Sequence, residues 1–189
     1  MQHKRRWDRA AVIQAAADLA DAEGLEQLTL TRLAEHLGIS TPSLYNHVAG
    51  LAGLRRDLAL LGLGELNTRL TRAVIGKAGN AAIASLAHVY RAFAKEHPGL
   101  YAATIRAPDP ADEEAKQVAQ GVVAVIVAVL AAYGLRGDEA VHAVRVLRSA
   151  LDGFVMLETT GGFGMPLDLD ETFRRLIQIM IRGFQQGQF

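Results

Sequence analysis

The sequence contains no cysteine, few aromatic residues and no excess of either charge. Without cysteine the chain can form no disulfide, no zinc site with thiolate ligands and no thiol nucleophile, which fits a reducing cytoplasm. Aromatic residues make up 6% of the chain and hydrophobic residues 50%, so we expect an aliphatic, alanine-rich core of packed helices. A formal net charge of zero argues against nonspecific coating of nucleic acid but leaves room for a local basic patch.

Long apolar segments are also lacking. The longest apolar run, Val122 to Tyr133, is too short to span a bilayer and indicates a buried helix of a soluble protein. The charged N-terminus is not followed by an apolar segment, so no signal peptide is expected. We therefore expect a cytoplasmic protein with no membrane partner.

Motifs for catalysis or for metal binding are missing from the sequence. The histidines at positions 36, 47, 88, 97 and 142 show neither a metal-binding i, i+4 pair nor an HExxH motif, and the glycines form no phosphate loop. Arg148 and Asp152 stand four residues apart, which is more typical of a helix salt bridge than of a catalytic pair. The sequence predicts neither an enzyme nor a cofactor.

The apolar periodicity is helical throughout, and no period-two strand pattern appears. An all-α fold is therefore predicted, with Asp138 capping one helix and Asp168 and Glu171 forming a capping box at the start of the last. Besides two short helices described next, the expected helices are Trp7–Glu23, Leu51 to about Lys77, Ala81–His97, Leu100–Arg106, Ala111–Tyr133, Asp138 to about Thr160 and a last helix to about Gln185.

Residues 29–48, TLTRLAEHLGISTPSLYNHV, indicate two short helices joined by a glycine turn. The first has an apolar face at i, i+3, i+4 and i+7, from Leu30 to Leu37. Thr29 can cap it, and Gly38 follows its last apolar residue, where a left-handed backbone is often needed. The second helix is predicted to begin with Thr41 as the cap and Pro42 at the first helical position.

The second helix presents a face of short hydrogen-bonding groups. Leu44 and Val48 point back toward the first helix, and no long apolar side chain lies on the opposite face. Such polar groups suit base edges and phosphate oxygens, as in a helix-turn-helix whose second helix lies in the major groove. Helix pairs of this kind also occur in proteins that bind no nucleic acid. The outward residues are Thr41, Ser43, Tyr45, Asn46 and His47.

A basic arm precedes this motif. Lys4, Arg5, Arg6 and Arg9 stand against a single acid, Asp8. Such arms contact phosphates or enter the minor groove, although a solvated terminus would have the same composition.

Residues 7–57 resemble the DNA-binding domain of TetR-family transcriptional regulators. The matching segments are 20–24, 28–29, 33–39 and 42–48, and the Leu-Tyr-x-His-Val core at 44–48 is the most specific of them. The rest of the chain matches in length, helical character and layout. One departure is the segment Ala49–Ala52, because the family commonly carries a basic, phosphate-anchoring residue there. The backbone N–H groups at the start of the next helix could take that role.

Two helices near the C-terminus carry more apolar residues than one neighbour can cover. A large apolar patch on a monomer favours pairing with a second copy, and a two-fold dimer would double the DNA site. An intramolecular core is the alternative. The candidate interface residues are Val144, Leu147, Leu151, Phe154, Phe173, Leu176, Ile177 and Met180.

The resemblance also implies a ligand pocket in the C-terminal part, where polar and aromatic side chains could be its lining or ordinary core. The candidates are His88, Phe93, His97, Tyr101 and Phe154.

We expect a helix-turn-helix domain in residues 1–57 and a larger ligand-binding and dimerisation domain in residues 58–189. The function predicted is a homodimeric repressor released from a palindromic DNA operator by a small apolar or amphipathic effector. The alternative is a helical enzyme or lipid-binding module with an incidental helix-turn-helix. The predicted DNA contacts are Lys4, Arg5, Arg6, Thr29, Thr41, Pro42, Ser43, Tyr45, Asn46 and His47.

Overall fold

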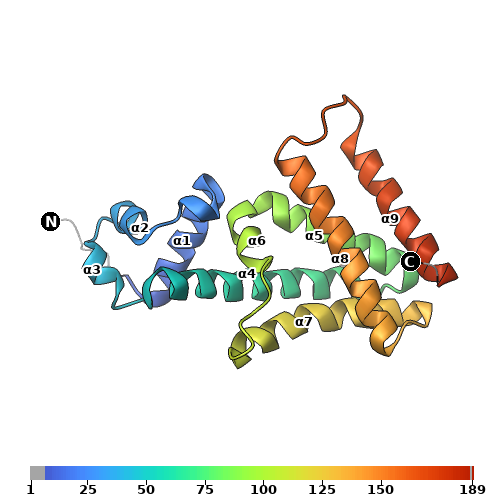
Figure 1. Ribbon diagram of the computed structural model, residues 1–189, viewed down its shortest axis with the longest axis horizontal. Coiled ribbons are helices and arrows are strands. Elements are labelled where there is room, and N and C mark those ends of the chain that lie inside the picture. Colours follow the sequence, from blue (N-terminus) through green and yellow to red (C-terminus); the bar gives the residue numbers. More distant parts are fainter. Residues whose placement is uncertain (1–6, 188) are drawn as a thin grey trace. The chain divides into compact units, whose positions relative to one another are not determined.

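The computed structural model describes residues 7–187 and 189, and these residues form helices and loops without a strand (Figure 1). This confirms the predicted all-α class. The α-helices are α1 (Arg9–Glu23), α2 (Leu30–Leu37), α3 (Thr41–Leu44), α4 (Gly50–Val74), α5 (Gly79–Glu96), α6 (Pro98–Thr104), α7 (Glu113–Leu130), α8 (Gly137–Thr159) and α9 (Leu169–Gln186), and two short 3₁₀ turns span Leu25–Gln27 and Ala131–Tyr133.

The chain divides into two compact units. The first unit comprises residues 1–64 and 96–116, and the second comprises residues 65–95 and 117–189. The boundaries therefore fall inside α4, before the last residue of α5 and inside α7, so neither unit is a single continuous segment. The expected functional division after residue 57 stays a prediction.

The residues that cap the helices agree only in part with those predicted from the sequence. Asp8 caps α1 by accepting the N–H of Ala11 at 2.8 Å, and Asp168 caps α9 by accepting the N–H of Asp170 at 2.8 Å. The predicted capping box is wrong, because the Glu171 carboxylate binds Arg174 and Arg175 instead.

The predicted cap of α8 is wrong as well. Arg136 holds the capping position in an extended conformation, and Asp138 lies in the first turn. There its carboxylate sits near the positive end of the helix dipole.

The core of the first unit is aliphatic. Leu28, Leu33, Leu44 and Leu54 are almost completely buried. One contact between α1 and α6 is exceptionally close, since a Cβ on Gly99 would lie 2.2 Å from the carbonyl carbon of Ala20. Only a residue without a side chain fits at this crossing.

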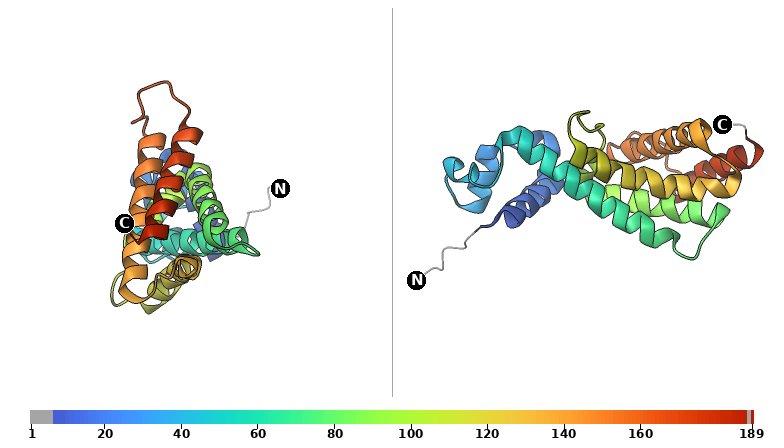
Figure 2. Two further views of the ribbon diagram at one scale, coloured as in Figure 1. Left: turned by 90° about the vertical axis from the view of Figure 1, so that its right-hand side faces the viewer. Right: turned by 90° about the horizontal axis from the view of Figure 1, so that it is seen from below.

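The core of the second unit contains a buried cation. Arg91 of α5 is 7% exposed and lies against the rings of Phe154 and Phe173, 5.3 and 4.8 Å from their centroids. It donates to Glu158 at 2.6 and 2.7 Å and to Asp170 at 2.7 Å. Because these acceptors come from α8 and from the start of α9, one guanidinium joins three helices, and Figure 2 shows α8 and α9 running side by side.

The predicted buried helix around Val122–Tyr133 is covered on one side only. Val122, Ile126 and Leu130 are buried, whereas Val123 is 40% exposed. By length and composition alone, the helical segment Glu113–Tyr133 could cross a membrane, and 28% of its most apolar stretch of 18 residues is buried.

Candidate nucleic-acid interface

The first helix and the turn of the predicted motif form as their sequence signals indicate. Thr29 Oγ1 accepts the N–H of Arg32 at 3.1 Å, so the predicted cap of α2 is confirmed. Gly38 adopts φ +66°, and the N–H groups of Gly38 and Ile39 close the helix end on the carbonyls of Glu35 and Ala34. This left-handed turn sends the chain directly into α3.

The second helix is shorter than predicted. Ser40, not Thr41, occupies the capping position of α3, and it makes no side-chain bond to the backbone. Its Oγ lies 2.7 Å from Oγ of Ser43 instead. After Leu44 the backbone continues in tighter i→i+3 turns, including the bond from His47 N–H to the Leu44 carbonyl at 2.8 Å. The segment is thus one α-helical turn, with Pro42 at its second position, followed by these tighter turns.

The side chains of this segment divide between core and solvent. Leu44 and Val48 are 0% and 4% exposed and face the core, as predicted. Tyr45 is 62% exposed, and Asn46 is exposed as well. Of the other predicted DNA contacts, Thr29 and Pro42 are exposed, and Thr41, Ser43 and His47 are half-buried. The arrangement therefore leaves a phenol and an amide open to solvent.

Every arginine between residues 7 and 64 has a carboxylate partner. Arg32 donates from Nε to Glu23 at 2.9 Å, and Arg55 reaches Glu26 at 3.3 Å. Compensated charges attract phosphates weakly, so these arginines are poor candidates for the basic patch. The predicted cations Lys4, Arg5 and Arg6 lie outside the described residues.

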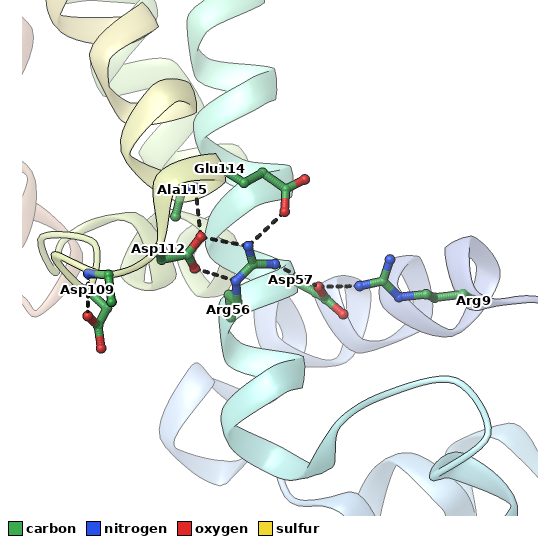
Figure 3. A network of polar contacts seen from close by, with 8 residues as sticks. Arg9, Arg56, Asp57, Asp109, Asp112, Glu114 and Ala115 are labelled. Carbon is green, nitrogen blue, oxygen red and sulfur yellow. Dashed lines mark hydrogen bonds and ion pairs between the residues drawn. The ribbon is translucent and has the colours of Figure 1, made fainter.

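Figure 3 shows a network that joins α1, α4 and the start of α7 within the first unit. Arg56 of α4 donates to Asp112 at 2.8 Å and to Glu114 at 2.7 Å. The neighbouring Asp57 is 6% exposed and accepts from Arg9 at 2.7 Å. The Arg56 hydrogen bond, followed by the N–H of Ala115, lowers the pKa of Asp112 to about 2. Sequence reasoning missed this network, because its partners lie 48 or more positions apart and follow no local spacing.

His97, one of the predicted ligand residues, makes a polar contact with Asp21 within the first unit. Its Nδ1 lies 2.9 Å from Oδ2 of Asp21, and the other carboxylate oxygen of Asp21 accepts the N–H of Leu100 at 2.8 Å. These bonds fasten the start of α6 to the end of α1, beside the close crossing at Gly99.

The five predicted ligand residues fall in both units. His97 and Tyr101 belong to the first, and His88, Phe93 and Phe154 belong to the second. The rings of His88 and Phe154 both contact Phe173, with centroid distances of 5.4 and 4.9 Å. Phe93 is fully buried, with its ring centroid 5.4 Å from the Arg69 guanidinium. A shared ligand pocket for all five stays a prediction.

Seven of the eight predicted interface residues are buried within the single chain, and Leu176 is half-buried. Leu147 and Leu151, for example, are 0% and 1% exposed. The apolar side chains that α8 and α9 do expose are different ones, including Val146, Met156 and Ile179. The spacing of apolar residues could not separate these two faces, because both are apolar.

The sequence matches known families along most of its length. Residues 12–49 match the model for bacterial regulatory proteins of the tetR family, and residues 83–180 match that for the tetracyclin repressor-like C-terminal domain. The chain is 37% identical over 182 residues to the uncharacterized HTH-type transcriptional regulator Rv0681 of Mycobacterium tuberculosis, covering 96% of this chain and 83% of that protein.

Two solved structures share the fold. BioQ of Mycobacterium smegmatis with its natural double-stranded DNA operator superposes with a TM-score of 0.71 at 18% identity, covering 95% of this chain and 99% of that one. A single-residue variant of TetR from Acinetobacter baumannii AYE in complex with minocycline gives 0.72 at 22% identity, covering 96% and 98%. The fold and the helix-turn-helix define a DNA-binding transcriptional regulator. The chain belongs to the TetR family.

Proposed function

We propose that this regulator is a cytoplasmic, non-catalytic repressor that binds a palindromic operator as a homodimer and is released by a small molecule. The observation that carries the DNA-binding part is the α2–turn–α3 arrangement, which buries Leu44 and exposes Tyr45 and Asn46. The operator complex of BioQ and the minocycline complex of TetR support DNA binding and ligand response, respectively.

The proposed DNA contacts have different roles. Asn46 offers both a donor and an acceptor, so it can read a base edge. Tyr45 and His47 supply phosphate contacts, which set orientation without reading sequence. Thr41 and Ser43 are proposed to lie with Asn46 nearest the base edges, and Thr29 and Pro42 complete the proposed set of DNA contacts. The arm, through Lys4, Arg5 and Arg6, is proposed to supply further positive charge for phosphate contacts.

The start of α4 is a further proposed phosphate contact. Gly50 adopts φ +71° and begins a helix of 25 residues whose first turn contains no acidic residue. The N–H groups of that turn can bind a phosphate oxygen without a basic side chain. This would replace the basic residue that the family commonly carries at this point.

The proposed dimer joins α8 and α9 of two copies through their exposed apolar residues, such as Val146, Met156 and Ile179. A two-fold dimer places two copies of α3 on two half-sites, which must lie about 34–36 Å apart to enter successive major grooves. A ligand that binds more tightly to a dimer with another spacing would shift the population toward that spacing, and the DNA would be released.

Selection of an operator from random duplexes tests the proposal. The selected sequence should be palindromic, and its affinity should exceed that of a scrambled duplex at every salt concentration and fall as salt rises. Deleting residues 1–6 should make the salt dependence shallower by up to about three phosphate equivalents. Equal affinity for selected and scrambled duplexes would refute the proposed regulator.

A further inference from the structure

A groove of about 450 Å³ lies between α5 and α9 within the second unit. Its apolar floor consists of Ala81 and Ala84 from α5 and Ile177 and Ile181 from α9. The alanines are small, and they leave room between the two helix backbones. The volume lies within the range of small-molecule sites in proteins, about 300–1,000 Å³.

The polar lining of the groove is cationic and amide-rich. His88, Arg174 and Arg182 line it, together with three amide side chains, and none of the described residues that line it is acidic. Arg182 has no carboxylate partner anywhere in the described part of the chain. Arg174 is partly compensated, since Glu171 accepts from its Nε and Nη2 at 2.7 Å. The net charge around the groove is therefore positive, and Arg182 contributes most of it.

Both ends of the groove are defined by side-chain contacts. At one end Asn80 Oδ1 accepts from Tyr133 at 2.8 Å and from Gln185 at 3.3 Å. At the other end His88 lies edge-on to the ring of Phe173, 5.4 Å away. Asn80 and His88 are eight positions apart, which is about 12 Å along the helix, so the groove suits a short extended molecule.

We propose that this groove binds a small amphipathic anion, a carboxylate on a short aliphatic chain, with the chain along the isoleucines and alanines and the charge at Arg182. The proposal goes beyond the regulator's DNA binding, because it concerns the second unit alone and holds with or without an operator. Among the predicted ligand residues it retains only His88, which lines the groove.

Octanoate is the test ligand, and octan-1-ol is its uncharged counterpart of the same chain length. Titration of the full chain, followed by the backbone amide signals in NMR, gives both the site and the dissociation constant. The expected shifts lie on the facing sides of α5 and α9, and octanoate binds at least about threefold more tightly than octanol, because only octanoate pairs with an arginine.

The chain provides a matched control for the arginines. Arg174 and Arg175 are adjacent, both bind Glu171, and both are exposed, but only Arg174 lines the groove. Arg182→Gln and Arg174→Gln should weaken octanoate binding at least about threefold and leave octanol unaffected, and Arg175→Gln should change neither. Ala84→Leu, which fills the floor, should weaken both ligands.

Four results would overturn the proposal. They are equal affinity for octanoate and octanol, an unchanged dissociation constant in Arg182→Gln, an equal loss in Arg175→Gln, and amide shifts confined to residues away from α5 and α9. Operator affinity is measured separately on the same variants, so a failure of the groove is distinguishable from a failure of DNA binding.

Discussion

Tyr45 and Asn46 are neighbours in the chain but offer different chemistry to DNA. Both are exposed at the end of the helix-turn-helix. A phenol can donate one hydrogen bond to a phosphate of any sequence, whereas a carboxamide can bind adenine through two bonds.

This difference gives opposite expectations for two substitutions. Asn46→Ala should change base preference at one position of each half-site, by about 1–3 kcal/mol if the contact is bidentate. Tyr45→Phe should weaken binding to all sequences alike. Titration against the operator and a set of single-base variants would distinguish them. Parent-like binding by both variants would show that this segment does not face DNA.

The Asp112 carboxyl gives a second expectation at the scale of one residue. Its pKa of about 2 lies below the ordinary value of 3.8 because Arg56 binds the ionised form. A lowered pKa in the folded state means that the stabilisation is complete above pH 3.8 and is lost as the pH falls through about 2.

Arg56→Gln should therefore raise the pKa of Asp112 toward 3.8, which ¹³C NMR titration of the carboxyl carbons would measure. Glu171 is an internal control, because its pKa of about 2 depends on Arg174 and Arg175. If the pKa of Asp112 stays near 2 in the variant, Arg56 is not the cause of the lowered value.

At the scale of helices, the sequence predicts the features that depend on local signals and misses those that depend on distant partners. The Thr29 cap, the Gly38 turn and the burial of Leu44 depend on residues within a few positions of one another, so the sequence predicts them. The bounds of α3 are not predicted, because Ser40 and Thr41 are equally good caps in sequence and no local signal marks the change to tighter turns after Leu44. The face of α8 that is buried depends on its partner α9, which no local pattern specifies.

The crossing of α1 and α6 depends on the absence of one side chain. Gly99→Ala would place a Cβ 2.2 Å from the Ala20 backbone, which cannot move without shifting α1. We expect a loss of about 1–3 kcal/mol in the free energy of unfolding, as for other overpacked sites, measured by urea denaturation.

Gly64→Ala is the control for this experiment. Gly64 lies inside α4, and a Cβ there would meet nothing within 4 Å. Because alanine is the better helix former by about 1 kcal/mol, this variant should be as stable as the parent or more so. Parent-like stability of Gly99→Ala would show that α1 and α6 are free to separate.

At the scale of the whole molecule, the burial of a residue decides whether a charged substitution there affects folding of the chain or assembly of the dimer. Leu151 is 1% exposed and Ile179 is 66% exposed, although both lie on the two helices proposed to form the dimer. An arginine at a buried position adds an unpaired charge to the core. An arginine at an exposed position acts only on a surface contact.

Ile179→Arg should give a folded monomer, and Leu151→Arg should unfold the chain. Light scattering would report the mass, and circular dichroism would report the helix content. Ile75→Arg is the matched control, since Ile75 is 71% exposed but lies outside α8 and α9. A parent that is monomeric at micromolar concentration, or a dimeric Ile179→Arg, would contradict the proposed interface.

The interleaving of the two units along the chain has a consequence for building hybrid regulators. A DNA-binding segment taken from another protein and joined at a single point in α4 would replace residues 1–64 but leave residues 96–116 in place. The foreign segment would then have to fit against His97, Gly99 and Asp112, whose native partners are Asp21, Ala20 and Arg56. A hybrid that takes both residues 1–64 and residues 96–116 from the other protein would keep those partners together. An exchange of DNA specificity in this protein should therefore replace two segments of the chain and not one.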